Sequence, residues 1–170
     1  VGAALILVHF GDVRLTSFYR LFGVQDIPIW VSYIFSVFSI TVIINAFNLI
    51  DGVDCLAAGI ASVICFFFGV WYGLVGDNAL SLMAFVLLGA LLGFIFYNKT
   101  PAKIFLGDTG SLLIGLVIAL LSIRFIETNK INSGPYKVYS VPAVTIGILI
   151  VPLFDLARIF FLRIKARKSP

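Results

Sequence analysis

Long uncharged stretches of mostly apolar residues follow one another along the chain, separated by short polar segments. No charged residue lies between Asp26 and Asp51, and the stretches 55–76 and 78–98 are also uncharged. Crossing the hydrocarbon core of a bilayer takes about 20 mostly apolar residues in a helix, so the pattern predicts about five membrane-spanning helices. These predicted spans are 28–49, 55–76, 79–97, 109–126 and 141–162.

The apolar stretch 1–8 is too short to cross a membrane, and the chain does not begin with methionine. We interpret this stretch as the remnant of a sixth span, and the chain as a fragment cut within that helix. The expected fold is all-α, a multi-pass transmembrane helix bundle of about five whole spans plus the remnant, in a single membrane domain over 1–170. Strands are excluded, because the open edges of a sheet cannot face lipid.

The composition also indicates a membrane protein. Hydrophobic residues make up 61% of the chain and charged residues 12%, against about 45–50% and about 25% in ordinary soluble domains. The net charge is a modest +4, and several basic residues crowd the end of the chain. They are Arg163, Lys165, Arg167 and Lys168. This placement is typical of a cytoplasmic membrane anchor, and we expect no nucleic-acid partner.

Lysine and arginine also predict the orientation in the membrane. If the tail after Leu162 is cytoplasmic, alternation of the spans places the loop 98–108 and the turn 51–54 on the same side. The segments 9–26 and 127–140 then lie on the opposite side. The polar stretch between the remnant and the first whole span is too polar to cross, and we expect a short hairpin there.

Three aspartates carry the chemical interest. All three, Asp51, Asp54 and Asp108, fall at ends of predicted helices on the predicted cytoplasmic side. A carboxylate beside a membrane span is energetically costly, so its presence suggests a function. Carboxylates on one face suit Mg²⁺, which takes oxygen ligands and bridges to phosphate. The segment 107–111 opens the fourth span with free backbone N–H groups that suit a phosphate, and Lys103 would attract an anion. We predict a metal-assisted phosphate site at the cytoplasmic membrane surface.

Each of these residues also has a purely structural interpretation. In this interpretation, Asp51 and the glycine after it simply end a helix, and Asp108 or Thr109 simply caps one. Asp155 and Arg158, three residues apart, are expected to neutralise each other. Gly89 and Gly93 form a pair of small residues that predicts close helix packing. Three aspartates on one predicted face favour the functional interpretation for that set.

Two segments resemble signatures of a known family, the polyprenyl-phosphate N-acetylhexosamine-1-phosphate transferases of glycosyltransferase family 4. They are NAFNLIDGVDCLAAG at 45–59 and NKTPAKIFLGDTGS at 98–111. The resemblance extends to the stretches 11–14 and 152–155 and covers essentially the whole chain. The residues of these segments are more similar to those of the branch that uses UDP-N-acetylglucosamine than to those of the branch that makes the first lipid intermediate of peptidoglycan.

The resemblance implies the transfer of a sugar 1-phosphate, that of N-acetylglucosamine, from a UDP-sugar to undecaprenyl phosphate. The products are UMP and a lipid-linked pyrophosphoryl sugar, which initiates teichoic acid, O-antigen or related cell-wall polysaccharides. The implied setting is the bacterial inner membrane, with the site facing the cytoplasm. UDP-sugar, undecaprenyl phosphate and the lipid bilayer are the implied partners, and the resemblance allows a homodimer.

The resemblance also assigns residues. Asp108 matches the Mg²⁺ ligand, so Mg²⁺ is the expected cofactor, and Asp51 and Asp54 join it as candidate catalytic residues. Asn48 and Asn98 match residues that line the nucleotide and phosphate site. The full set of candidate substrate-binding residues is Asn48, Asn98, Lys103, Gly107, Thr109, Gly110 and Ser111.

Three departures from the family pattern stand out. The family carries a paired-aspartate motif upstream and a histidine-rich motif downstream, and neither occurs in the chain. Both absences agree with a fragment, which we expect to be inactive alone. Cys55 stands where the family usually has glycine, and this change could perturb the turn that holds Asp54.

Two other functions compete with this hypothesis. A fragment of an ion-coupled secondary transporter would use the aspartates to bind a coupling ion, but such folds favour broken helices and sites near the midplane. The predicted spans are not obviously interrupted, and the aspartates sit at their ends. A purely structural membrane subunit would leave the two dense polar motifs unexplained.

Overall fold

The computed structural model describes residues 1–165 of the chain, apart from residues 18 and 20–26. Every regular element in the described residues is a helix, which confirms the predicted all-α class. The helices are α1 (Gly2–His9), α2 (Ile29–Ile50), α3 (Leu56–Val75), α4 (Asn78–Asn98), α5 (Gly107–Ile131), α6 (Val141–Ile148) and α7 (Ile150–Lys165).

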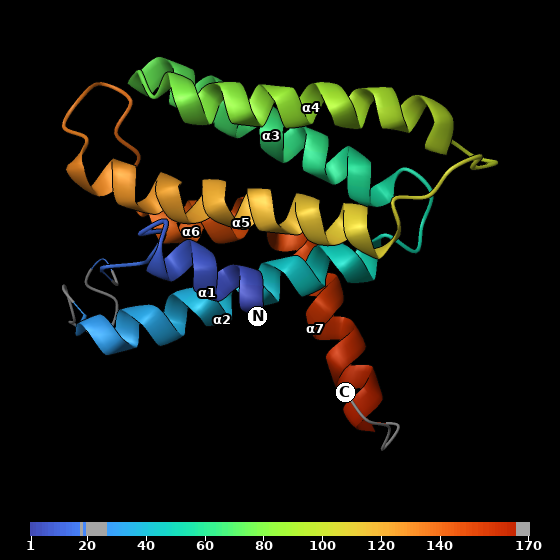
Figure 1. The fold of residues 1–170 in the computed structure, drawn as a ribbon, viewed down its shortest axis with the longest axis horizontal. Coiled ribbons are helices and arrows are strands. Elements are labelled where there is room, and N and C mark those ends of the chain that lie inside the picture. The colour runs from blue at the N-terminus through green and yellow to red at the C-terminus, as the bar shows by residue number, and fades with distance from the viewer. Residues whose placement is uncertain (18, 20–26, 166–170) are drawn as a thin grey trace.

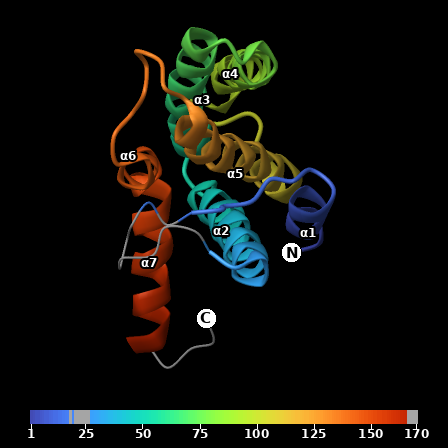
Figure 2. The ribbon, with the colours of Figure 1, turned by 90° about the vertical axis from the view of Figure 1, so that its left-hand side faces the viewer.

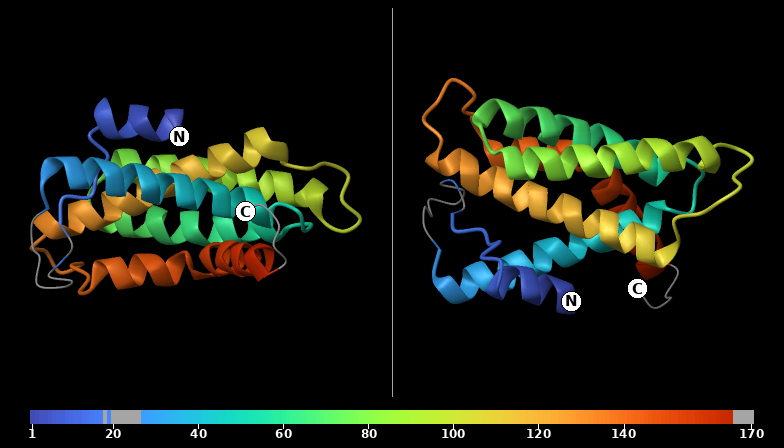
Figure 3. Two further views of the ribbon diagram at one scale, coloured as in Figure 1. Left: turned by 90° about the horizontal axis from the view of Figure 1, so that it is seen from below. Right: turned by 45° about the horizontal axis from the view of Figure 1, so that its top comes forward.

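Four long apolar helices, α2 to α5, form the body of the structure and run lengthwise beside one another (Figures 1 and 3). Each is long and apolar enough to cross a membrane, and the bent pair α6 and α7 adds a fifth span if it counts as one. The predicted multi-pass bundle is therefore confirmed. The turn 51–55 and the loop 99–106 lie at the same end of the bundle (Figure 1). We call this the site end, and the other the far end.

Helix α5 lies at the centre of the packing, between α2 on one side and the pair α3 and α4 on the other (Figure 2). Against α3, the ring of Phe125 lies 4.5 Å from that of Trp71 and 5.5 Å from that of Phe68, centroid to centroid. The buried Tyr72 hydroxyl donates to the Leu121 carbonyl at 2.7 Å. Aromatic packing and a satisfied hydroxyl thus fix α3 on α5.

The predicted packing of Gly89 and Gly93 is wrong for the described residues. Both lie exposed on α4, and an added Cβ atom at either would meet nothing within 4 Å. Helix α4 instead contacts α3 through Phe85, whose ring would lie 2.9 Å from a Cβ atom on Gly69. Spacing of small residues along a helix shows which ones share a face, but it does not show which face meets a neighbour.

Helix α5 runs to Ile131, beyond the predicted end of its span at 126. Two charged side chains near the predicted end, Arg124 and Glu127, are bonded to the segment after α1. Glu127 accepts hydrogen bonds from the backbone N–H and the hydroxyl of Thr16, at 2.8 and 2.7 Å. Arg124 donates to the Gly11 carbonyl at 2.8 Å. Because these groups are satisfied by a distant part of the chain, they do not end the helix.

The predicted span 141–162 is not one straight helix. Helices α6 and α7 meet at a break with their axes bent by 70°. Pro152, in the first turn of α7, has no N–H to donate to the Ile148 carbonyl, and its ring crowds that carbonyl. The proline therefore explains why the helix breaks here although the apolar pattern continues.

Two sequence predictions concern residues outside the described part of the chain. Residues 18 and 20–26 of the predicted hairpin, which covers 11–28, lie there, and so do Arg167 and Lys168 of the basic tail. The orientation that rests on this tail stays a prediction.

The close approach of α2 and α5 at Gly115 yields a test of the packing. A Cβ atom at Gly115 would lie 2.7 Å from the Ile44 Cα atom, so Gly115→Ala must push the two backbones apart. Overpacking of this kind typically costs about 1–3 kcal/mol, and we expect a lower melting temperature in detergent. Gly93→Ala, where the space is open, should leave the melting temperature unchanged or raise it. Equal melting of the two variants would contradict the packing.

Candidate functional site

At the site end, the turn 51–55 and the loop 99–106 are joined through the Asn98 side chain. Asn98 is only 6% exposed. Its Oδ1 atom accepts from the backbone N–H of Cys55 at 2.7 Å, and its Nδ2 group donates to the Ile104 carbonyl at 2.7 Å. One amide thus satisfies backbone groups of both loops and fixes them relative to each other.

Asp54 makes a second contact between the same two loops. Its Oδ2 atom accepts from the Thr100 hydroxyl at 3.2 Å. No sequence pattern singled out Thr100, whose role depends on the fold of the loop rather than on its neighbours in the chain. Asp54 thus belongs to the loop contact, whereas the other two aspartates lie at the start of α5.

Asn48, near the end of α2, holds the first turn of α5. Its Nδ2 group lies 3.2 Å from Asp108 Oδ1 and 3.0 Å from Ser111 Oγ, and it donates to both. Ser111 is 1% exposed, and its hydroxyl lies 3.0 Å from the Gly107 carbonyl, to which it donates. The signature residues 60 positions apart are therefore brought into direct contact, as the predicted phosphate site requires.

Asp51 lies beside this first turn. Burial raises the pKa of the Asp51 carboxyl, the backbone N–H of Gly107 lowers it, and the charge of Asp108 raises it again. Gly107 adopts a positive φ of 62°, which glycine reaches without strain and which brings the chain into the helix. The carboxylates of Asp51 and Asp108 are thus near enough, at the start of α5, for the charge of one to act on the other.

This pair of carboxylates can hold a hard cation. In the described part of the chain, no three His, Cys, Asp or Glu side chains converge as a closed metal site. Mg²⁺ is usually bound by one or two carboxylates, with water and substrate phosphates completing its shell. Asp51 and Asp108 fit this open arrangement. A cation held there would offset the two effects that raise the pKa of Asp51, which are burial first and the charge of Asp108 second.

The remaining predicted site residues lie around the pair. Thr109 is exposed in the first turn of α5, where uncapped N–H groups suit a phosphate. Gly110 follows it and packs on the Leu106 side chain. The backbone N–H of Lys103 donates to the Tyr97 carbonyl at 3.0 Å, and the Lys103 residue is exposed. All the predicted site residues thus belong to the site end.

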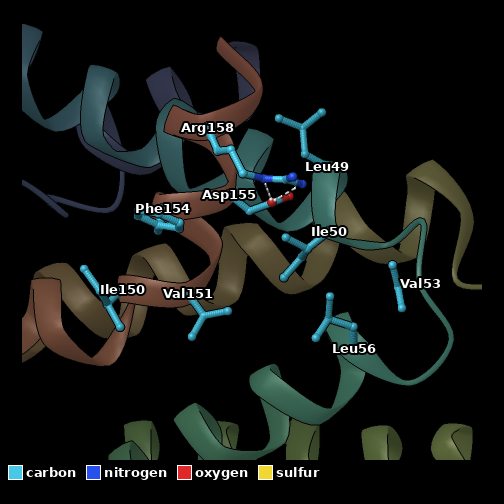
Figure 4. A pocket seen from close by; sticks show the side chains of 9 residues that line it. All are labelled: Leu49, Ile50, Val53, Leu56, Ile150, Val151, Phe154, Asp155 and Arg158. Atoms are coloured by element: carbon cyan, nitrogen blue, oxygen red, sulfur yellow. Dashed lines mark hydrogen bonds and ion pairs between the residues drawn. The ribbon is translucent and has the colours of Figure 1, made fainter. Parts of the chain in front are cut away.

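An apolar groove of about 420 Å³ opens beside the turn 51–55 (Figure 4). Its walls come from the end of α2, the start of α3 and the first half of α7. They are formed by Leu49, Ile50, Val53, Leu56, Ile150, Val151, Phe154, Asp155 and Arg158. Asp155 and Arg158 form an ion pair at 2.8 Å, as expected for residues three apart. We call this the α7 groove. Sequence reasoning missed it, because only the bend before α7 brings that helix to α2.

Comparison with known proteins places these features in a family. The model of glycosyl transferase family 4 matches residues 1–126. A probable undecaprenyl-phosphate N-acetylglucosaminyl 1-phosphate transferase of Bacillus subtilis (strain 168) is 39% identical over 159 residues, which cover 91% of this chain and 41% of the relative.

Two further relatives show the same relationship. The undecaprenyl-phosphate alpha-N-acetylglucosaminyl 1-phosphate transferase of Escherichia coli (strain K12) is 28% identical over 174 residues, covering 99% of this chain and 46% of the relative. The phospho-N-acetylmuramoyl-pentapeptide-transferase of Staphylococcus carnosus (strain TM300) is 39% identical over 118 residues, 69% of this chain and 36% of the relative. The chain thus spans less than half the length of these curated relatives.

Asn98 offers a test of the contact between the loops. Asn98→Asp keeps the acceptor for Cys55 but places a carboxylate oxygen against the Ile104 carbonyl. An unmade bond at a buried group costs about 1–3 kcal/mol, so the loop should open more often. Trypsin should then cleave after Lys103 several-fold faster than in the wild type. Asn78→Asp, an exposed change at the start of α4, is the control, and equal cleavage of both variants would refute the role of Asn98.

Cys55 offers a test of the backbone in the turn. It adopts a positive φ of 61°, in the left-handed region that glycine reaches without strain. A non-glycine residue in this region costs about 1 kcal/mol or more. We therefore expect Cys55→Gly to raise the melting temperature, whereas Cys55→Ala, which removes the thiol but keeps the strain, should not. A rise in both variants would point to the thiol instead of the backbone.

Proposed function

The chain belongs to glycosyl transferase family 4, and from this membership we propose that it carries part of the active site of a polyprenyl-phosphate sugar-1-phosphate transferase. The donor in this proposal is UDP-N-acetylglucosamine and the acceptor is undecaprenyl phosphate. One observation carries the proposal: Asp51, Asp108 and the uncapped start of α5 lie together at one end of a membrane bundle. The names of the relatives from B. subtilis and E. coli support the lipid and the sugar.

The reaction joins two anions at the membrane surface. An oxygen of the lipid phosphate bonds to the phosphorus that carries the sugar, and the bond from that phosphorus to UMP breaks, so that UMP leaves. The protein forms no covalent bond to the substrates in this reaction. It catalyses the transfer by aligning the two phosphates and by offsetting their negative charge. The residues at the site end are of the kind that this task needs.

Asp108 is the proposed ligand of Mg²⁺, with Asp51 beside it. The ion, when bound, supplies the positive charge that offsets the phosphates. Asn48 fixes the Asp108 carboxylate by its 3.2 Å hydrogen bond. The free N–H groups in the first turn of α5 bind a phosphate oxygen, and the exposed Lys103 attracts the nucleotide. Asp54, held by Thr100 at 3.2 Å, borders the same site.

The α7 groove suits the acceptor's tail. Its walls are apolar except for the pair of Asp155 and Arg158, and it adjoins the turn that carries Asp51 and Asp54. A groove of this kind lets an isoprenoid chain enter sideways from the bilayer while the nucleotide arrives from water. This division requires the site end to face the cytoplasm, as the distribution of lysine and arginine predicts.

An ion-coupled transporter gains some support from the bend between α6 and α7, since broken helices are frequent in transporters. The carboxylates argue against it. Asp51 and Asp108 lie at helix ends at the site end rather than at the break. The match of residues 1–126 to a glycosyl transferase family also favours the enzyme.

Asp108→Asn in the complete gene product tests this function. The variant keeps the shape of the side chain but removes one charge from the proposed Mg²⁺ site, so we expect the transfer rate to fall by at least about 100-fold. The measurement is transfer of labelled N-acetylglucosamine 1-phosphate from the UDP-sugar to undecaprenyl phosphate with Mg²⁺ present. Melting temperature in detergent confirms that the variant is folded.

Asp12→Asn is the matched control. Asp12 is exposed, and it pairs with Arg14 at 2.7 Å. It follows Gly11, which is bonded to Arg124 in the far half of α5. This variant should keep its activity within about twofold, because its charge lies away from the proposed site and is screened by water. Wild-type activity in Asp108→Asn would overturn the proposed function.

A further inference from the structure

Helix α7 leaves the bundle. It is bent by 70° from α6, which runs along the bundle (Figures 1 and 2). Pro152 is the only buried residue that α7 contributes within the described chain. If the bundle crosses the membrane, a helix bent this far from its direction lies closer to the membrane plane than to the membrane normal.

The level of α7 in the membrane follows from its neighbours. Its first half, with Ile150 and Phe154, lines the α7 groove together with Ile50 and Val53. Ile50 is the last residue of α2, and Val53 belongs to the turn that leads into α3. Helix α7 therefore lies at the boundary where two spans end, on the same side as the candidate site.

The sequence of α7 has two faces. At 100° per residue, the side chains of Leu153, Phe160 and Ile164 fall within about 40° of one another on one side of the helix. Arg158 and Lys165, seven residues apart, lie on one flank of this side, and Arg163 lies on the other flank, next to Leu156. An apolar side with basic residues on both flanks is typical of a helix that lies in the membrane interface.

The exposed fractions argue against two simpler arrangements. Phe160 is 48% exposed, Phe161 69% and Ile164 52%, which is unfavourable in water. Arg163 and Lys165 are exposed as well, which is unfavourable within the hydrocarbon core. At the level where acyl chains and head groups meet, both sets of side chains are satisfied.

We propose that α7 is an in-plane amphipathic helix that binds anionic phospholipids beside the candidate site. Leu153, Phe160 and Ile164 insert among the acyl chains, and Arg163 and Lys165, one on each flank, contact the phosphate head groups. Arg158 contributes less, because its charge is matched by Asp155 at 2.8 Å. Charge complementarity selects the lipid: Arg163 and Lys165 have no ion-pair partner among the described residues, and each attracts an anionic head group by about 1 kcal/mol. The proposal does not depend on the transferase activity.

A cysteine scan tests the placement of α7. Single cysteines from 153 to 165 are introduced into the complete gene product carrying Cys55→Ala and Cys65→Ala, and the protein is reconstituted in phosphatidylglycerol vesicles. A water-soluble maleimide should label positions 163 and 165 at least about fivefold faster than 153, 160 and 164, as for an interfacial helix. Fluorophores at 153, 160 and 164 should be quenched by lipids that carry a quencher on the acyl chain.

Two results of the scan would overturn the in-plane helix. Uniform shielding from the maleimide would mean that α7 is buried or crosses the membrane. Shielding at 153, 160 and 164 without quenching by lipid would mean that protein covers the apolar side.

The charge of α7 is tested by the double variant Arg163→Gln and Lys165→Gln. In nanodiscs of mixed phosphatidylglycerol and phosphatidylcholine, native mass spectrometry measures which lipids the protein retains. The preference for phosphatidylglycerol should fall by about fivefold for each cation removed, as expected from about 1 kcal/mol per charge. Lys137→Gln, an exposed change in the loop before α6, should leave the preference unchanged. Equal preference in the double variant and the wild type would refute the proposal.

Discussion

A bilayer offers no water to a free backbone N–H or C=O group, and this constraint governs the structure throughout. It requires continuous helices where the chain crosses the lipid. It also decides where polar side chains of the spans bond: the hydroxyls of Ser36, Ser62 and Thr145 donate to carbonyls four residues back in their own helices. The Tyr72 hydroxyl reaches a carbonyl of a neighbouring helix. These polar groups thus find acceptors on the helix backbone without interrupting the helices.

The same constraint shapes the candidate site, because a turn between two spans exposes backbone groups close to lipid. At the site end, the Asn98 side-chain amide satisfies the Cys55 N–H and the Ile104 carbonyl. Asn48 bonds the side chains of Asp108 and Ser111 in the first turn of α5. The two asparagines thus hold the turns and the candidate site together, so structural and chemical roles coincide. This explains why capping and catalysis were difficult to separate in the sequence: the same side chains serve the turns and border the proposed phosphate site.

The bend before α7 connects the site to the membrane. A straight helix over 141–162 would have run along the bundle and left the turn 51–55 open to lipid. The break at Pro152 instead carries α7 across the end of α2 and forms the α7 groove. One proline therefore places an apolar groove, and a basic helix at its side, next to the charged residues of the site end.

The sequence by itself determined the all-helical class, the bounds of α2, α3 and α4 to within one residue at each end and the segments that form the candidate site, because uncharged apolar runs and the motifs at 45–59 and 98–111 are local features. The tertiary structure alone decided how far α5 extends, since Glu127 bonds Thr16 across 111 positions. It likewise decided that the charge of Asp108 acts on Asp51 while Asp54 contacts Thr100. Periodicity identifies the faces of a helix, but the partner of each face depends on packing between segments far apart in the chain.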